Sequence, residues 1–245
     1  MSSPVQSSPV QSSPVQSKIL IIAILIVSHA YCVGVGAYRI FPFGLLQTAK
    51  RMILNSSSSD RILGPYYFQK KTHLETLQQR PIVMIGDSIT DGCEWSELLN
   101  RQDISNRGIG GDTTFGVLGR IESILKMNPQ KAFLMIGTND LSRDIPASEV
   151  IENTKLIING LQKINCQVFV QSILFVKSEQ VKKNQDISIV NKAVKDACET
   201  TGAKYIDLNT TLAPQGFLDP SITNDGLHLM GDGYQRWKKE IEKYL

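Results

Sequence analysis

The sequence predicts an α/β fold in which helices cover both faces of a central parallel sheet, preceded by one N-terminal membrane helix. Residues 81–245 contain five short apolar runs, and longer segments with apolar residues at helical spacing lie between them. Strands that are apolar throughout are typical of parallel sheets buried on both faces, which right-handed crossovers build into a doubly wound sandwich. Residues 19–38 form a separate apolar run without Lys, Arg, Asp or Glu.

Residues 1–18 are expected to be a disordered tail, because residues 2–16 repeat Ser-Ser-Pro-Val-Gln three times and such a composition cannot bury a core. Residues 19–38 are long enough to cross a bilayer core of about 30 Å as a helix. We therefore expect a single-pass membrane protein with a transmembrane signal anchor at 19–38. A cleaved signal peptide, with Ser28 and Ala30 before the cleavage site, is the second interpretation, and a buried soluble helix is the third.

The sequence leaves open which side of the membrane the C-terminal part faces. Lys18 precedes the apolar run, whereas Arg39, Lys50 and Arg51 follow it, and this bias favours a cytoplasmic C-terminal side. That orientation conflicts with the usual layout of a signal anchor. Residues 39–80 are expected to be a connector, in which Phe41, Phe43, Leu45 and Leu46 either lie at the membrane interface or pack on the domain.

The folded domain is expected at residues 81–245. Its strands are expected at residues 82–85, 104–106, 132–136, 167–170 and 204–207. Its helices are expected at about residues 94–100, 114–127, 147–164, 186–201 and 232–244. Polar clusters that contain glycine follow the first three strands and precede the last helix. Because ligands bind at the carboxyl ends of strands in such sheets, we expect these clusters to meet at one edge.

Composition excludes several classes of protein. Of the 245 residues, 42% are hydrophobic and 20% are charged, which excludes a wholly disordered chain or a protein with many membrane spans. Residues 1–80 carry a net charge of +6 and residues 81–245 a net charge of −3, so we expect a membrane surface and no nucleic acid as partner. Four cysteines without a C-x-x-C pair argue against a zinc site, and Cys166 and Cys198 are expected to be buried free thiols.

Three residues have the types and spacing of a nucleophilic triad. Ser88 follows a predicted strand, where it is either an exposed nucleophile or a helix N-cap. His228 is the only histidine of residues 81–245, and Asp225 precedes it by three residues, close enough to hold its imidazole. Donors for an oxyanion are expected from the backbone of Ser88 and of the glycine turn that ends at Gly111, and from the Asn139 side chain. A dinucleotide loop is disfavoured, since Thr113 replaces the third glycine of G-x-G-x-x-G.

Four segments together resemble the sequence blocks of the SGNH hydrolases, also called the GDSL esterase/lipase superfamily, over roughly residues 81–245. These segments are Gly86-Asp87-Ser88, the turn ending in Gly111, Gly137-Thr138-Asn139-Asp140 and Asp225-Gly226-Leu227-His228. Residues 106–114, followed by Arg120-Ile121, resemble the branch that contains the platelet-activating-factor acetylhydrolase α subunits. Two positions depart from the pattern: Ile89 stands where the first block has Leu, and Phe175 where many relatives carry Pro, which puts the substrate-side loop 174–184 in question.

The resemblance implies a flavodoxin-like three-layer α/β/α sandwich with a central parallel five-stranded sheet and no metal or organic cofactor. It implies that Ser88 is the nucleophile, His228 the general base and Asp225 its partner, with Ser88, Gly111 and Asn139 forming the oxyanion hole. Asp87 and Asp112 are expected to hold loops by local hydrogen bonds. The expected activity is hydrolysis of a carboxylic ester, acetyl or short acyl, on a sugar or lipid. An acyltransferase with the same triad and a catalytically silent binding module tethered to the membrane are the alternatives; the oligomeric state stays open.

Overall fold

The computed structural model describes residues 63–245. The expected tail at 1–18, the expected transmembrane helix at 19–38 and most of the expected connector at 39–80 lie outside the described residues. Within residues 63–245, no helix combines the length and the apolar character that crossing a membrane requires.

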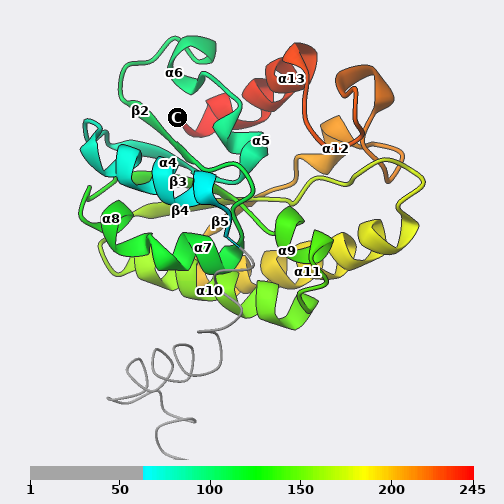
Figure 1. Ribbon diagram of the computed structural model, residues 1–245, viewed down its shortest axis with the longest axis horizontal. Helices are drawn as coiled ribbons and strands as arrows, with labels where there is room; N and C mark the ends of the chain where they lie inside the picture. The colour runs from blue at the N-terminus through cyan, green and yellow to red at the C-terminus, as the bar shows by residue number, and fades with distance from the viewer. Residues whose placement is uncertain (1–62) are drawn as a thin grey trace, which may run out of the picture. The chain divides into compact units, whose positions relative to one another are not determined.

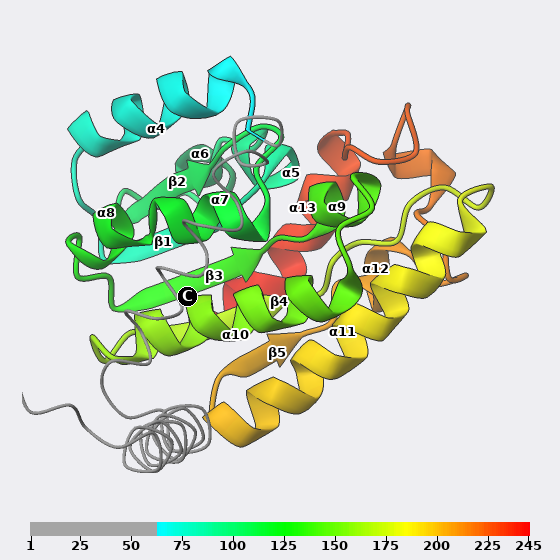
Figure 2. The ribbon, with the colours of Figure 1, turned by 60° about the horizontal axis from the view of Figure 1, so that its bottom comes forward.

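The predicted parallel sheet of five strands is confirmed, and every strand lies within two residues of its expected position. All pairings are parallel and the strands follow the order β2-β1-β3-β4-β5, which is the flavodoxin-like order (Figure 1, and Figure 2 for the position of β1). The strands are β1 (Ile82–Gly86), β2 (Ile104–Gly108), β3 (Lys131–Met135), β4 (Gln167–Gln171) and β5 (Lys204–Ile206). Gly86 pairs with both Gly108 and Met135, so the loops after the three adjacent strands begin at the same level.

Helices cover both faces of the sheet (Figure 2). One face packs against α7 (Thr114–Gly119), α8 (Ile121–Leu125), α10 (Ala147–Gln162) and α11 (Val181–Thr201). The other face packs against α6 (Trp95–Leu98), α12 (Asn209–Leu212) and α13 (Gly231–Ile241). Four further short helices occur in the described part: α5 (Ser88–Asp91), α9 (Thr138–Ser142), and the 3₁₀ turns η1 (Pro220–Ile222) and η2 (Glu242–Tyr244).

Two expected helices differ from those observed. The segment 114–127 divides into α7 and α8 at Arg120, whose φ of −122° is not helical and whose side chain reaches inward to Asp112. The helix expected from residue 186 starts at Val181, five residues earlier. The first residues of α11 are exposed or half-buried and so lack the apolar spacing that marked the rest of the helix.

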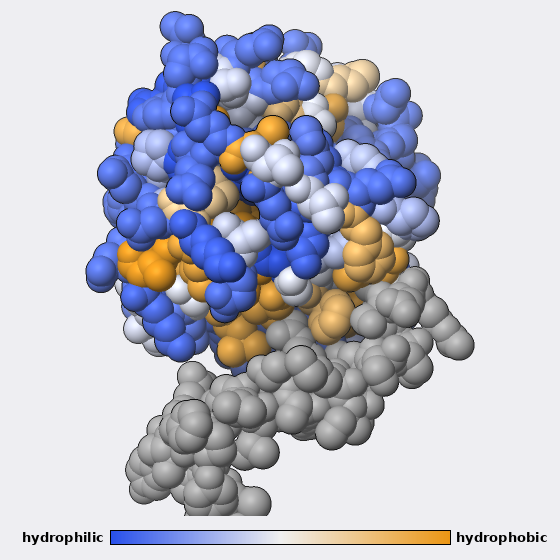
Figure 3. Space-filling view, turned by 60° about the vertical axis from the view of Figure 1, so that its left-hand side comes forward, coloured by the Kyte–Doolittle hydropathy of each residue, from blue (hydrophilic) through white to orange (hydrophobic). Residues whose placement is uncertain are grey.

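Strand residues alternate between two apolar cores. Val83 and Ile85 face the helices α7, α8, α10 and α11, whereas Ile82 and Met84 face α6, α12 and α13. Cys166 and Cys198 are buried free thiols, as predicted, and so is Cys93. On the outside, hydrophilic residues predominate and apolar ones form separate patches on the face that Figure 3 shows.

Part of the expected connector is a helix that packs on the domain. This helix, α4 (Pro65–Thr76), buries only Tyr67 and Leu74, which join Leu63 and Ile109 in a small third apolar cluster. The Tyr67 hydroxyl donates a hydrogen bond to the Gly116 carbonyl at 2.7 Å. The connector residues expected either to lie at the membrane interface or to pack on the domain, Phe41, Phe43, Leu45 and Leu46, lie outside the described residues.

The helix α10 offers a matched pair of positions that tests the core. Ile157 is fully buried, and its neighbour Leu156 is 37% exposed. We expect Ile157→Ala to lower the free energy of unfolding by about 2–5 kcal/mol through lost burial and a cavity, and Leu156→Ala to change it by about 1 kcal/mol or less. Urea unfolding followed by circular dichroism measures both. Equal losses in the two variants would contradict the packing described for α10.

Candidate active site

The structure brings Ser88, His228 and Asp225 together in one chain of hydrogen bonds. Ser88 Oγ lies 2.9 Å from His228 Nε2, and His228 Nδ1 lies 2.6 Å from Asp225 Oδ2. Ser88 comes from the turn after β1, whereas the other two residues come from the loop before α13. Residues far apart in the sequence thus meet beyond the carboxyl end of the sheet.

The turn after β1 fixes the position of Ser88. Asp87 caps α5, because its Oδ1 accepts a hydrogen bond from the Ile89 N–H at 3.0 Å. Ser88 is therefore the first helical residue, whose N–H has no partner within the helix. Gly86 permits the tight approach of this turn to the sheet, since a side chain there would collide with Thr90 Oγ1 and the Met135 carbonyl. The interpretation of Ser88 as a helix N-cap is therefore wrong, because Asp87 takes that position, whereas Ser88 is the N1 residue and a hydrogen-bond partner of His228.

Asp225 orients His228 through both carboxylate oxygens. While Oδ2 contacts the imidazole, Oδ1 accepts the N–H groups of Leu227 and His228 at 2.9 and 2.8 Å. The hydrogen bond with His228 is the main reason why the pKa of Asp225 lies well below its usual range. The side chains of His228 and Asp225 are 45% and 47% exposed, so this acid–base pair is open to solvent.

The loop 174–180 supports the residues of the acid–base pair from behind. Gly226 has a φ of +78°, and an added Cβ there would lie 2.6 Å from the Lys177 side chain. The Lys177 N–H donates to the Gly226 carbonyl at 2.9 Å. The loop 174–180, part of the expected substrate-side loop 174–184, therefore contacts the loop that carries His228.

Gly111 and Asn139 lie close together, because the Asn139 side chain is hydrogen-bonded to the residue after Gly111. Asn139 Nδ2 donates a hydrogen bond to the Asp112 carbonyl at 2.9 Å, which fixes the orientation of the amide and leaves its second N–H. Gly111 has a φ of +73°, a conformation that favours glycine. Both residues are half-buried. Gly111 follows β2 and Asn139 follows β3, the two strands on either side of β1, and Ser88 follows β1. The three expected oxyanion donors thus come from three adjacent loops at one edge of the sheet.

Buried carboxylates connect these loops. Asp112 forms an ion pair with Arg120 at 2.9 Å, with side chains that are 0% and 2% exposed. Arg120 also donates to the Gly86 carbonyl at 3.4 Å. Asp140 accepts the N–H of Thr114 at 3.0 Å and its hydroxyl at 2.5 Å. The turns after β1, β2 and β3 are therefore tied together beneath the site.

Only part of this network of hydrogen bonds and ion pairs was predictable from the sequence. Local hydrogen bonds were expected for two of its acids. The local hydrogen bonds expected for Asp87 and Asp112 are present, and Asp112 accepts one from the Thr113 N–H at 2.8 Å. No role was expected for Arg120 or Asp140, because their hydrogen-bond partners lie eight or more positions away in the sequence. An Arg and several Asp residues close to glycine turns were the available signal.

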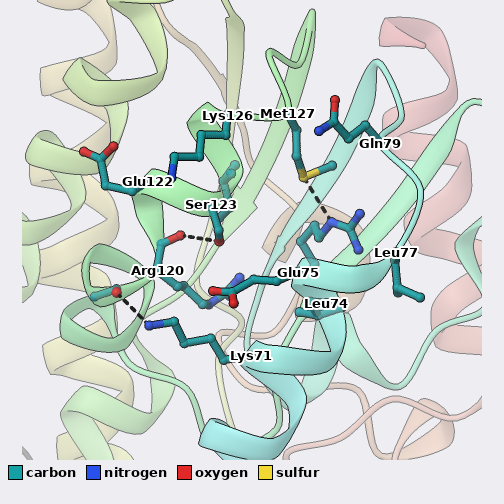
Figure 4. Close-up of a pocket in the computed structure, with 13 residues that line it drawn as sticks. Lys71, Leu74, Glu75, Leu77, Gln79, Arg120, Glu122, Ser123, Lys126 and Met127 are labelled. Carbon is teal, nitrogen blue, oxygen red and sulfur yellow. Dashed lines mark hydrogen bonds between the residues drawn. The ribbon is translucent and has the colours of Figure 1, made fainter.

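A cavity lies between α4 and α8 (Figure 4). It has a volume of about 400 Å³ and shares no residue with the expected site. Arg107 lines it and is 3% exposed, with Nε beside Met127 Sδ at 3.3 Å and Nη2 donating to the Gln78 carbonyl at 3.1 Å.

Among the described residues, no group of three His, Cys, Asp or Glu side chains is arranged to hold a metal ion.

Burial of Asp87 predicts a pH-dependent stability. Burial raises the pKa of Asp87 to about 7, and the nearby Asp112 and Asp140 charges add to the rise. An unfolded Asp titrates near pH 4, so between about pH 4 and 7 the folded chain holds more protons and its unfolding free energy falls as the pH rises. Asp87→Asn retains an acceptor for the Ile89 N–H and removes this titration. Relative to wild type, the variant should gain roughly 1–3 kcal/mol between pH 4 and 8.

Urea unfolding at a series of pH values measures this difference. Contributions of other groups, including Asp225, are common to both proteins and cancel in the comparison. Asp232→Asn, at an exposed position of α13, is the matched control and should follow the wild-type curve. Parallel curves for Asp87→Asn and wild type would show that the Asp87 carboxyl carries no burial penalty.

Comparisons with known proteins agree with the fold and with part of the sequence-based assignment. The chain is 25% identical over 167 residues to an N-acylneuraminate cytidylyltransferase from Streptococcus agalactiae, covering 65% of this chain but 39% of that protein. The chain thus spans about two fifths of the length of that relative. It is 30% identical over 165 residues to platelet-activating factor acetylhydrolase IB subunit alpha1 from Rattus norvegicus, covering 62% of this chain and 69% of the relative.

A solved structure from Streptococcus pneumonia, which carries a provisional platelet-activating-factor name, has a TM-score of 0.64 at 28% identity and covers 73% of this chain and 90% of its own. Residues 84–236 match the model of the GDSL-like Lipase/Acylhydrolase family. This range includes all the residues of the expected site. The chain belongs to the GDSL-like lipase/acylhydrolase family.

Proposed function

We propose that this protein is a serine esterase that hydrolyses a carboxylic ester through an acyl-enzyme on Ser88. The observation that carries the proposal is the chain of hydrogen bonds from Ser88 Oγ through His228 to Asp225, with distances of 2.9 and 2.6 Å. The family description, which names lipases and acylhydrolases, supports the same reaction class. Short hydrogen bonds of this kind are what a nucleophile, its base and the orienting acid require.

The geometry leads to a sequence of proton transfers. Asp225 accepts a hydrogen bond from the Nδ1–H of His228, which keeps the proton on Nδ1 and leaves Nε2 free to accept the proton of Ser88 Oγ. Oγ then attacks the ester carbonyl carbon and forms a tetrahedral oxyanion. The protonated imidazole returns its proton to the leaving alcohol, and the acyl group stays on Ser88. A water molecule, deprotonated by His228, attacks the acyl-enzyme and forms a second tetrahedral intermediate. When the bond between the acyl carbon and Ser88 Oγ breaks, the imidazolium returns its proton to Oγ and the carboxylic acid is released.

Three groups are positioned to stabilise the oxyanion. They are the N–H of Ser88, the N–H of Gly111 and the second amide hydrogen of Asn139. Asn139 is held by the Asp112 carbonyl, so its amide needs no reorientation when charge develops on the substrate. Fixed donors at such a position are usually worth about 10²–10³-fold in kcat each.

We propose an acetyl or short acyl group as the acid part of the ester, on a sugar or lipid. The support is by similarity, since the 30% identical rat relative is an acetylhydrolase by name. Transfer of the acyl group to an alcohol other than water would use the same residues. Product analysis with and without an added acceptor separates hydrolysis from transfer.

The assignment of the nucleophile predicts the effect of two substitutions. Ser88→Ala and His228→Gln should each lower kcat for 4-nitrophenyl acetate by about 10³-fold or more, because the triad acts as a unit. A fluorophosphonate probe should form an adduct on Ser88, located by peptide mass spectrometry, in wild type and not in Ser88→Ala.

The control is Ser148→Ala, at an exposed serine in the first turn of α10. It should retain wild-type turnover and labelling. Wild-type-like turnover in folded Ser88→Ala or His228→Gln protein would refute the triad, and an adduct on another serine would move the nucleophile.

We also propose that residues 19–38 anchor the protein in a membrane, with their uncharged apolar composition as the only support. Full-length protein should then stay in the membrane fraction after extraction at alkaline pH, whereas a chain without residues 1–38 should be released. The mass of the purified protein distinguishes a retained anchor from a cleaved signal peptide. Complete release of the full-length, uncleaved chain would exclude the anchor.

A further inference from the structure

One cation, Arg143, follows the oxyanion residue Asn139 at the end of α9, and a second, Lys183, contacts α9 from α11. Asn139 is the second residue of α9, and Ser142 and Arg143 follow it at i+3 and i+4. Residues at these spacings are neighbours on a helix surface. Groups held by Ser142 and Arg143 are therefore placed about one helical turn from the Asn139 amide.

Arg143 contacts the loop that is expected to bind the oxyanion. Its Nη2 donates a hydrogen bond to the Gly111 carbonyl at 2.9 Å, and a Cβ on Gly111 would lie 3.6 Å from the same nitrogen. The side chain is exposed, and a guanidinium has four further N–H donors. Arg143 thus presents unused donors to solvent next to Gly111.

Lys183 approaches the same place from another helix. It lies in the first turn of α11, and its Nζ donates to Ser142 Oγ at 2.6 Å, which places this turn beside α9 (Figure 1). Partial burial lowers the pKa of Lys183, while the Asp87 charge, next to the nucleophile, opposes this effect. Within residues 63–245, the hydrogen-bond acceptor of this partly desolvated ammonium is a neutral hydroxyl.

The acids near the site are already engaged. Asp225 binds His228, Asp112 pairs with Arg120, and Asp140 accepts both donors of Thr114. Within residues 63–245, neither Arg143 nor Lys183 forms an ion pair. Lys183 is partly buried and has no carboxylate in direct contact in this part of the chain, so an anionic group on a ligand would compensate its charge.

We propose that Arg143 and Lys183 select ester substrates that carry a carboxylate or phosphate close to the scissile bond. The inference rests on the proposed function, because it concerns the substrate of that same site. The anionic group would lie between the guanidinium and the ammonium, beside α9. A guanidinium fork matches both carboxylate and phosphate oxygens, and the ammonium adds a point charge.

Matched acetyl esters test this selectivity. The substrates are 4-acetoxybenzoate, 4-acetoxyphenyl phosphate and the neutral 4-acetoxybenzamide, with each kcat/KM divided by the rate of uncatalysed hydrolysis. Wild type at low ionic strength should favour at least one anionic ester by about tenfold over the amide, and the preference should shrink in 0.5 M salt. Which anion is favoured identifies the recognised group.

Substitution of the two cations should reduce this preference. Lys183→Met and Arg143→Gln should each lower the ratio of anionic to neutral kcat/KM about threefold, and the double variant should bring it near one. The control is Lys192→Met, which removes the same charge from α11 at a position 79% exposed and paired with Asp196. The control should retain the wild-type ratio.

Calorimetric binding of the same three compounds to Ser88→Ala protein keeps the inference separate from the proposed reaction. The anionic compounds should bind about tenfold more tightly than the amide, and Lys183→Met added to Ser88→Ala should remove most of the difference. Equal binding of all three, or a preference that Lys183→Met and Arg143→Gln leave intact, would overturn the inference. If the anionic compounds bind selectively but wild type does not turn over the esters, the proposed esterase activity is contradicted and the inference about anion binding stands.

Discussion

The buried ion pair between Arg120 and Asp112 is the constraint on which the site depends. It lies beneath three loops, and through Arg120 it reaches the Gly86 carbonyl at the end of β1. The Asp112 carbonyl in turn holds the Asn139 amide. A change in this pair would therefore displace the turn of the nucleophile and the oxyanion donors together. The break between α7 and α8 is a consequence of the same contact, because Arg120 must leave helical geometry to reach inward.

Most of the fold was predictable because strands buried on both faces are apolar throughout. The strands β1, β3 and β4 carry that pattern, whereas β2 and β5 show it more weakly. The long helices α10 and α13 were predictable from apolar residues at helical spacing. The helix α4 was not, since it buries only Tyr67 and Leu74, and the four-residue helices α5 and α12 are too short to show any period. Their existence depends on contacts with remote parts of the chain, which a local pattern does not contain.

The candidate site divides in a similar way. Ser88, Asp225 and His228 were predictable because their chemistry needs particular residue types in polar clusters beside strands. The roles of Arg120, Asp140 and Lys183 were not, because each depends on a partner from another loop. Arg and Lys are common on protein surfaces, and only the three-dimensional arrangement distinguishes a cation next to an oxyanion loop from one in solvent.

The two sides of the site differ in how they are held, and this difference bears on substrate selection. The turn of Ser88 and the loops of Gly111 and Asn139, which carry the proposed nucleophile and oxyanion donors, rest on buried, mutually bonded side chains, whereas His228 and Asp225 are nearly half exposed. The loop 174–180 supports the exposed pair through the Lys177 backbone, and it leads directly into the turn of α11 that carries Lys183. One continuous segment thus contacts the loop of the general base and supplies a cation beside Asn139. A substrate anion bound there would stabilise the same segment that positions His228, so recognition and catalysis would be coupled through residues 174–183.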